Sequence, residues 1–340
     1  MYNVYYIIPD ILRGSFSLQN AIRRVIRGQF ADLFRDWFPP NKPIGGVKVM
    51  YQHCQILRGE GVNASVVLMG KYHGKFFDCD VPTIPYSSAL RDLRPNDVVI
   101  IPEYIPSLIN LFKFARCVIF VQNWSPIYIY EVGRLRQSVS SGYIDYGFAM
   151  TMACTNWLDS LLIRDSPGRR GVVSNFIDHT IFYPLERLRI PERILAMPRK
   201  NPNDLRAIVG SLGKYRENVV YADNLMETEL INEYRRSDIF IATGYPEGLG
   251  LPSLEAMACG CVVVGFTGRG GDEFMIHEDT ALIARDGDVN EVAALVKRVL
   301  NDAVLKERLR ARGREMALRY SVDRTRGQLI NFYQKLDSQS

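Results

Sequence analysis

The sequence predicts an α/β protein made of two Rossmann-like domains, and three observations support this prediction. First, 340 residues exceed what one ordinary hydrophobic core holds. Second, short apolar runs rich in β-branched residues alternate with segments long enough for helices. Third, the runs are apolar throughout, which is typical of parallel strands that are covered on both faces.

The predicted strands fall into two series. The first series comprises residues 4–8, 64–69, 97–101 and 117–122. The second series comprises residues 193–197, 206–210, 219–222, 239–242 and 261–265. The segment 167–185, rich in Gly, Pro and Arg, lies between the two series and is the expected joint. We therefore predict a domain boundary between residues 171 and 172.

The composition is that of a soluble globular protein, with 47% hydrophobic and 23% charged residues. A net charge of +5 is too small to indicate nucleic acid, but it suits a phosphate-bearing ligand or an anionic membrane surface. No signal peptide and no apolar run of roughly 18 residues is visible, so we expect a cytoplasmic protein, soluble or peripheral. Six scattered cysteines favour a reducing compartment, and four scattered histidines offer no metal-ligand spacing.

Residues 15–40 carry apolar side chains at helical spacing, with arginines interleaved. One interpretation is that these residues form amphipathic helices packed on the N-terminal domain. The other is a basic, aromatic surface that docks on a membrane or on a lipid-linked acceptor.

The stretch from Tyr245 to Gly260 is the most informative part of the chain. It follows a predicted strand, and Pro252 and Gly260 mark the start and the end of a helix. Glu247 is then in the loop before the helix, and Glu255 is about one turn inside it. The helix N-terminus favours a diphosphate, at the sheet edge where ligands bind.

This stretch resembles the E-x7-E signature of family 4 of the retaining glycosyltransferases, which have the GT-B fold. The resemblance extends to segments 174–184, 234–241, 268–273 and 321–323, and covers roughly residues 172–335. It implies two Rossmann-like domains that face each other across an interdomain cleft. The expected acceptor-binding domain comprises residues 1–171 and the nucleotide-sugar-binding domain residues 172–320. Residues 321–340 are expected to form a helix that crosses back to the N-terminal domain.

The resemblance also assigns roles to individual residues. Glu255 is expected to hold the ribose hydroxyls, and Glu247 to contact the donor sugar as a catalytic residue. The remaining expected donor-binding residues are Gly248, Leu249, Gly250, Leu251, Asn224, Leu225, Gly45 and Gly46. For Gly45 and Gly46 a plain turn is the alternative.

Two basic residues are expected to neutralise the donor diphosphate. Arg199 and Lys200 follow the strand 193–197 directly, and because they are adjacent, either of them could reach the phosphates. We expect both to be catalytic through charge stabilisation of the leaving group.

Two residues are candidates for the acceptor side. Asn123 stands near a position where the family often has histidine, and it is an acceptor-side candidate. Glu103 is another, although an isolated glutamate is commonly a surface residue. Asp78 to Asp80 spell D-x-D, which we interpret as a loop rather than a metal site, because a metal-free phosphate site is available elsewhere.

The resemblance implies metal-independent, retaining transfer of a hexose from a UDP-sugar, with UDP-glucose the expected donor and GDP-mannose and dTDP-rhamnose left open. The expected acceptor is a saccharide or a lipid-linked saccharide in polysaccharide, exopolysaccharide or cell-envelope biosynthesis. The alternatives are a GT-B sugar-nucleotide epimerase or phosphorylase, and a non-catalytic nucleotide-sugar-binding subunit.

Overall fold

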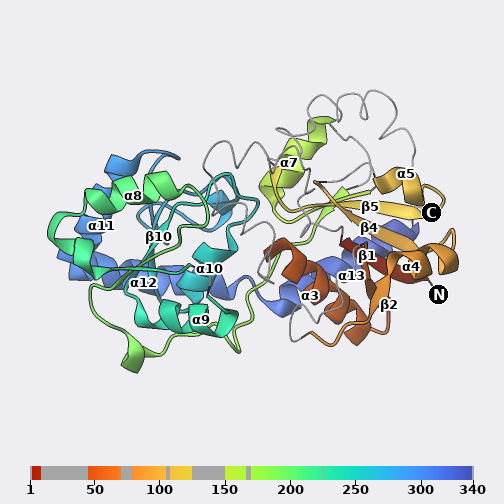
Figure 1. Ribbon diagram of the computed structural model, residues 1–340, viewed down its shortest axis with the longest axis horizontal. Helices are drawn as coiled ribbons and strands as arrows, with labels where there is room; N and C mark the ends of the chain where they lie inside the picture. The colour runs from red at the N-terminus through yellow and green to blue at the C-terminus, as the bar shows by residue number, and fades with distance from the viewer. Residues whose placement is uncertain are drawn as a thin grey trace, which may run out of the picture. The chain divides into compact units, whose positions relative to one another are not determined.

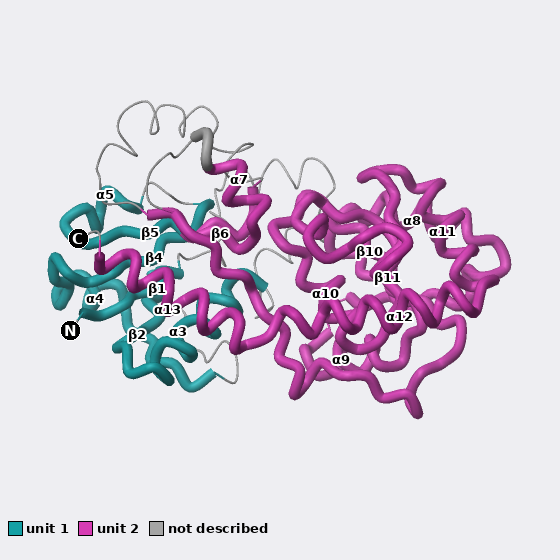
Figure 2. Tube along the Cα trace, turned by 180° about the vertical axis from the view of Figure 1, so that it is seen from behind, with its two compact units in different colours: residues 1–119 teal, residues 120–340 magenta. Residues whose placement is uncertain are grey.

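A computed structural model gives the fold of the chain (Figure 1). It describes residues 2–8, 45–69, 79–104, 108–124, 150–165, 170–223 and 225–338. The chain divides into two compact units, residues 1–119 and residues 120–340, which Figure 2 colours separately. The segment 15–40 and Asp78 lie outside the described residues.

The first unit alternates strands and helices. Its elements are β1 (Asn3–Ile8), α3 (Gly45–Gly59), β2 (Asn63–Leu68), β3 (Thr83–Pro85), α4 (Tyr86–Asp92), β4 (Val98–Pro102), α5 (Ile109–Phe112) and the start of β5 (Arg116–Val121). Strand β1 pairs in parallel with β2 on one side and with β4 on the other. The apolar run of β4 is buried along its whole length, as expected for a parallel strand with both faces covered.

Two more strands continue this sheet beyond β5. They are β6 (Met150–Ala153) and β7 (Arg170–Val172), and helix α7 (Asn156–Asp165) connects them. The strand order is β3-β2-β1-β4-β5-β6-β7, which is a doubly wound order with its reversal between β1 and β4.

A second sheet lies wholly within the second unit and has five strands in the order β12-β11-β10-β8-β9. All four of its pairings are parallel. The elements that follow β7 along the chain are η3 (Glu186–Leu188), β8 (Ile194–Ala196), α8 (Pro202–Gly210), η4 (Gly213–Asn218), β9 (Val219–Tyr221), α9 (Glu227–Arg236), β10 (Ile239–Ala242), α10 (Leu251–Ala258), β11 (Val262–Gly265), η5 (Gly270–Glu273), β12 (Leu282–Ile283), α11 (Val289–Asn301), α12 (Ala303–Leu318) and α13 (Val322–Ser338). Both sheets thus confirm the predicted α/β fold with two Rossmann-like domains.

One predicted strand is wrong. Residues 206–210 form the second half of α8 rather than a strand. Leu205, Ile208, Val209 and Leu212 are all buried, and their spacing is that of one helix face. Because Pro202 stands in the first turn, the helix begins before the apolar run that resembled a strand. The sequence also gave no sign of β3, β6, β7 and β12, which have only two to four residues.

The last helix, α13, packs beside β7. The Thr325 hydroxyl donates to the carbonyl oxygen of Ser174 (2.7 Å), and the Ser174 amide donates to the Gln328 side chain (2.9 Å). A Cβ added at Gly171 in β7 would lie 2.8 Å from the ring of Phe332. Strands up to β7 belong to the first sheet and strands from β8 to the second, whereas the compact units divide at residue 119. The boundaries at residues 171 and 320 stay predictions.

The six cysteines are free thiols, and all but the half-buried Cys79 are buried. Burial raises the pKa of Cys117 and of Cys261 to about 12. Among the described residues, no helix is long and apolar enough to cross a membrane. Within the same residues, no group of three or more His, Cys, Asp or Glu side chains could hold a metal ion.

Candidate active site

The second sheet has its topological switch point between β8 and β10. The connection after β8 runs to α8 and the connection after β10 runs to α10, so two loops leave neighbouring strands at the same edge. These loops are residues 197–201 and 243–250. Ligands of doubly wound sheets bind at such an edge, because the helices diverge there and leave a crevice.

Lys200 and Glu247 meet between these two loops. The Lys200 ammonium lies 2.8 Å from a Glu247 carboxylate oxygen and donates to the carbonyl oxygen of Pro246 (2.9 Å). The side chains keep 33% and 20% of their exposure, so the pair is accessible to a ligand. The neighbouring Arg199 is exposed. The structure therefore joins Lys200, rather than Arg199, to Glu247.

Asn201 also joins the two loops, a contact that no local sequence pattern predicted. Its side-chain amide nitrogen donates to the carbonyl oxygens of Thr243 and Tyr245, both at 2.8 Å. The Thr243 hydroxyl in turn donates to the carbonyl oxygen of Lys200 (3.3 Å). The 42 residues that separate Asn201 from Thr243 explain why no local motif reveals this contact.

Helix α10 begins where the sequence predicted. Gly250 caps the helix in a left-handed conformation (φ 90°), which glycine adopts without steric cost, and Pro252 stands in the first turn. Glu255 is one turn further and accepts a hydrogen bond from the Tyr234 hydroxyl (3.2 Å). Tyr234 is fully buried, and burial together with the Glu255 carboxylate raises its pKa well above the usual value. The Tyr234 hydroxyl thus stays protonated and fixes the Glu255 carboxylate from α9.

Gly248 is pressed against the backbone after β5. A Cβ added there would lie 1.6 Å from the carbonyl oxygen of Gln122, which no side chain could tolerate without movement of one of the two segments. The Asn123 amide donates to the carbonyl oxygen of Pro246 (3.4 Å), so a second contact joins the same segments. Both segments belong to the second unit.

Replacement of Gly248 by alanine is expected to push the 243–250 loop away from Gln122. Because the obstacle is backbone rather than a flexible side chain, we expect a free energy of unfolding lower by about 1–3 kcal/mol, as for overpacking. Urea denaturation followed by tryptophan fluorescence would measure this free energy of unfolding. Gly210→Ala is the control, since nothing lies within 4 Å of a Cβ at that position. Equal stability of the two variants would contradict the close backbone contact.

The turn 268–273 supports the same loop from the other side. The Glu247 amide donates to the carbonyl oxygen of Gly268 (2.9 Å). At the end of the turn, a Glu273 carboxylate oxygen accepts the backbone N–H of Trp157 (2.9 Å) at the start of α7. A carboxylate there satisfies an unpaired helix N–H group and interacts well with the helix dipole.

Three other predicted donor-binding residues lie at the same sheet edge. Leu249 is buried and Leu251 is half-buried, as the first residue of α10. Leu225 is half-buried after β9, and Asn224 lies outside the described residues. Ala222 donates its amide to the carbonyl oxygen of Ala196, which ties the end of β9 to β8.

The first unit holds three predicted residues. Gly45 and Gly46 open α3, which follows β1 in the described chain. Glu103 follows β4 and is 5% exposed, so it is a buried carboxyl group rather than a surface residue. Since β1 and β4 flank the switch point of the first sheet, Glu103 stands at the carboxyl end of a switch-point strand.

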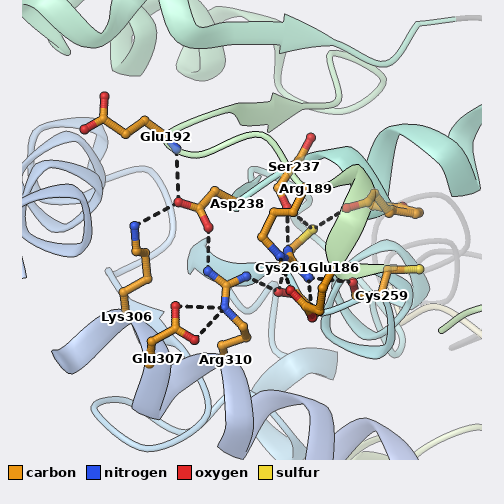
Figure 3. Close-up of polar contacts among 12 residues, drawn as sticks. Glu186, Arg189, Glu192, Ser237, Asp238, Cys259, Cys261, Lys306, Glu307 and Arg310 are labelled. Carbon is orange, nitrogen blue, oxygen red and sulfur yellow. Dashed lines mark hydrogen bonds and ion pairs between the residues drawn. The ribbon is translucent and has the colours of Figure 1, made fainter. Parts of the chain in front are cut away.

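A buried ion network anchors the strand that carries the site (Figure 3). Asp238, just before β10, is 2% exposed and accepts hydrogen bonds from Lys306 (2.9 Å) and Arg310 of α12. The Glu192 amide donates to the same carboxylate (3.1 Å). Burial acts to raise the pKa of Asp238, but the hydrogen bonds from Lys306 and Arg310 outweigh it and hold the pKa below its usual value.

Comparison with known proteins identifies a domain in this part of the chain. Residues 205–316 match the family described as Glycosyl transferases group 1. The matched segment includes Glu247 and Glu255 but begins after Lys200.

Two curated relatives show the range of the similarity. The chain is 27% identical over 248 residues to an Alpha-1,6-glucosyltransferase of Actinobacillus pleuropneumoniae serotype 7, a match that covers 67% of this chain and 71% of the relative. It is 32% identical over 116 residues to the O-antigen chain mannosyltransferase B of Escherichia coli, covering 34% and 30% of the two proteins.

A solved structure supports the fold. HepE of Anabaena, crystallised in complex with UDP and glucose, superposes with a TM-score of 0.72 at 13% identity, over 98% of this chain and 100% of that one. The fold is therefore the GT-B fold, and residues 205–316 are similar to the Glycosyl transferases group 1 domain.

Proposed function

We propose that the chain is a retaining hexosyltransferase that takes a sugar, glucose in our proposal, from a UDP-sugar. The acceptor is a saccharide or a lipid-linked saccharide of the cell envelope. The observation that carries the proposal is the Lys200–Glu247 pair at the switch point of the second sheet, with Glu255 one turn inside the helix that follows. This arrangement combines a cation for phosphate with two carboxylates for hydroxyl groups.

Each group has a chemical task. Lys200 and the first N–H groups of α10 stabilise the diphosphate as it departs, and Arg199 adds charge at the rim. Glu255, oriented by Tyr234, accepts hydrogen bonds from the ribose hydroxyls, and Glu247 accepts them from the sugar. Leu225, after β9, contacts the base, and Asn123 serves the acceptor side.

The transfer proceeds on one face of the sugar. The bond between the anomeric carbon and the diphosphate oxygen breaks while the bond to the acceptor oxygen forms. The acceptor hydroxyl proton passes to the leaving diphosphate, so that UDP leaves and the anomeric configuration is retained. Charge stabilisation by Lys200 requires no metal ion for this step.

The donor and the acceptor are inferred from the similar proteins. HepE was crystallised with UDP-glucose, and one relative is named a glucosyltransferase, which together support UDP-glucose. Other relatives are named GDP-mannose-dependent mannosyltransferases of phosphatidylinositol mannosides, or O-antigen chain mannosyltransferases. Their acceptors support a role in cell-envelope polysaccharide or glycolipid synthesis, where the enzyme would work at the cytoplasmic membrane surface.

Purified protein incubated with UDP-glucose, GDP-mannose or dTDP-rhamnose tests the proposal. We expect release of UDP, faster with a saccharide acceptor, and an α-linked product by NMR. An inverted product would contradict retention, and faster release of GDP would reassign the donor. Nucleotide release that ignores every acceptor, or donor binding without turnover, would favour the epimerase and the binding-subunit alternatives respectively.

Glu255→Ala is expected to weaken UDP binding by roughly 10- to 100-fold, since charge-assisted hydrogen bonds contribute about 1.5–3 kcal/mol each. Tyr234→Phe should weaken it less, because the carboxylate remains and only its hydrogen bond from Tyr234 is lost. Isothermal titration calorimetry measures both. UDP affinity that does not change in Glu255→Ala removes the ribose role.

A further inference from the structure

The side chain of Asn201 bridges the two loops of the site. Both of its contacts, to Thr243 and Tyr245, are carbonyl oxygens at 2.8 Å. Only the nitrogen end of the amide can donate, and both of its hydrogens are used here. A carboxylate, a hydroxyl or a hydrogen atom in this position could not make this pair of bonds.

The backbone at Asn201 limits which residues can stand there. Its dihedral angles, φ 49° and ψ 52°, are in the left-handed region, which asparagine and glycine tolerate best. The residue also caps α8, and Lys200 precedes it directly. Asn201 therefore fixes the turn from which the Lys200 side chain projects.

The two carbonyl groups flank Gly244, over which Glu247 folds. A Cβ at Gly244 would lie 2.6 Å from the Glu247 carboxylate oxygen that contacts Lys200. Asn201 thus holds the backbone on both sides of the position against which Glu247 rests. Its hydrogen bonds involve neither the Lys200 ammonium nor the Glu247 carboxylate, so they can persist if those two groups separate.

We propose that Asn201 is a positioning residue. It holds the loops of Lys200 and Glu247 at a fixed spacing, so that both side chains stay in place when the donor replaces their mutual contact. This inference rests on the proposed function. Without the amide, the carbonyl oxygens of Thr243 and Tyr245 lose the two hydrogen bonds that tie them to the turn of Lys200. Lys200 and Glu247 are then expected to sample geometries that fit the donor poorly.

Asn201→Gly is the test variant, because glycine keeps the left-handed backbone and removes only the amide. Its matched control is Glu192→Gly, which changes another non-glycine residue with positive φ (60°) outside the two loops. We expect faster amide hydrogen exchange in residues 243–250 for Asn201→Gly alone. We also expect a kcat/KM for UDP-glucose lower by about 10- to 100-fold, as for a misplaced catalytic group.

A double-mutant cycle separates positioning from general stability. If Asn201 acts through Lys200, Asn201→Gly in a Lys200→Met background should weaken UDP-glucose binding much less than in the wild-type protein. Additive effects, or unchanged exchange in residues 243–250, would overturn the inference. Wild-type protein that binds no nucleotide sugar, with altered exchange in Asn201→Gly, would instead contradict the proposed function and leave the loop bridge standing.

Discussion

Lys200→Met is expected to lower kcat/KM for the nucleotide sugar by about 100- to 1000-fold, which corresponds to about 3–4 kcal/mol of transition-state stabilisation. The reason is that negative charge grows on the departing diphosphate, and Lys200 is the cation that the structure places 2.8 Å from Glu247. Methionine keeps most of the side-chain volume without the charge. Steady-state kinetics with UDP-glucose, together with UDP affinity, measure the loss.

Arg199→Met is the matched control, since it removes a charge from the adjacent, exposed residue. We expect a decrease in kcat/KM of less than about tenfold, because charges at exposed positions are screened. If Arg199→Met caused the larger loss and Lys200→Met remained near wild type, the diphosphate contact would belong to Arg199.

Asp238→Ala is expected to lower the free energy of unfolding by about 3–5 kcal/mol, because it removes the buried carboxylate that pairs with Arg310 and Lys306. Arg310 is 9% exposed, and its Nη1 donates to the carbonyl oxygen of Gly260, two residues beyond the end of α10. The substitution should therefore destabilise α10 as well as β10. Chemical denaturation monitored by circular dichroism measures the change.

Glu307→Ala is the control for Asp238, because Glu307 also contacts Arg310 but is 65% exposed. Its expected cost is at most about 1 kcal/mol.

The pKa of Asp238 is lower in the folded state, so its contribution to stability is present above the unfolded value of about 4 and lost as the pH falls below it. The stability difference between wild type and Asp238→Ala should narrow in acid. A constant difference would contradict the ion network.

Local sequence signals predicted those parts of the site that neighbouring residues determine. The loop and helix from Tyr245 to Gly260 were predicted with Glu247 and Glu255 in their observed places, because Pro252 and Gly260 specify the helix ends directly. Strands β8 to β11 of the second sheet were predicted because they are continuous apolar runs. The exception is residues 206–210, where one face of helix α8 produces a similar run.

Contacts between distant segments could not be predicted. The choice between Arg199 and Lys200 depends on which side chain turns toward Pro246, 46 residues from Lys200. The pairing of Tyr234 with Glu255 and the bridge made by Asn201 depend likewise on strand order. A single sequence gives the types of these residues but not the sheet order that brings them together.

The burial of five of the six thiols has a practical use for labelling. Maleimide reagents modify thiolates at accessible positions, so Cys79 is the position they reach first in the folded protein. A Cys79→Ser background would let a single cysteine be introduced at Val304, which is 82% exposed at the start of α12. One fluorophore attached there would label the second unit at α12 and leave both loops of the site unmodified.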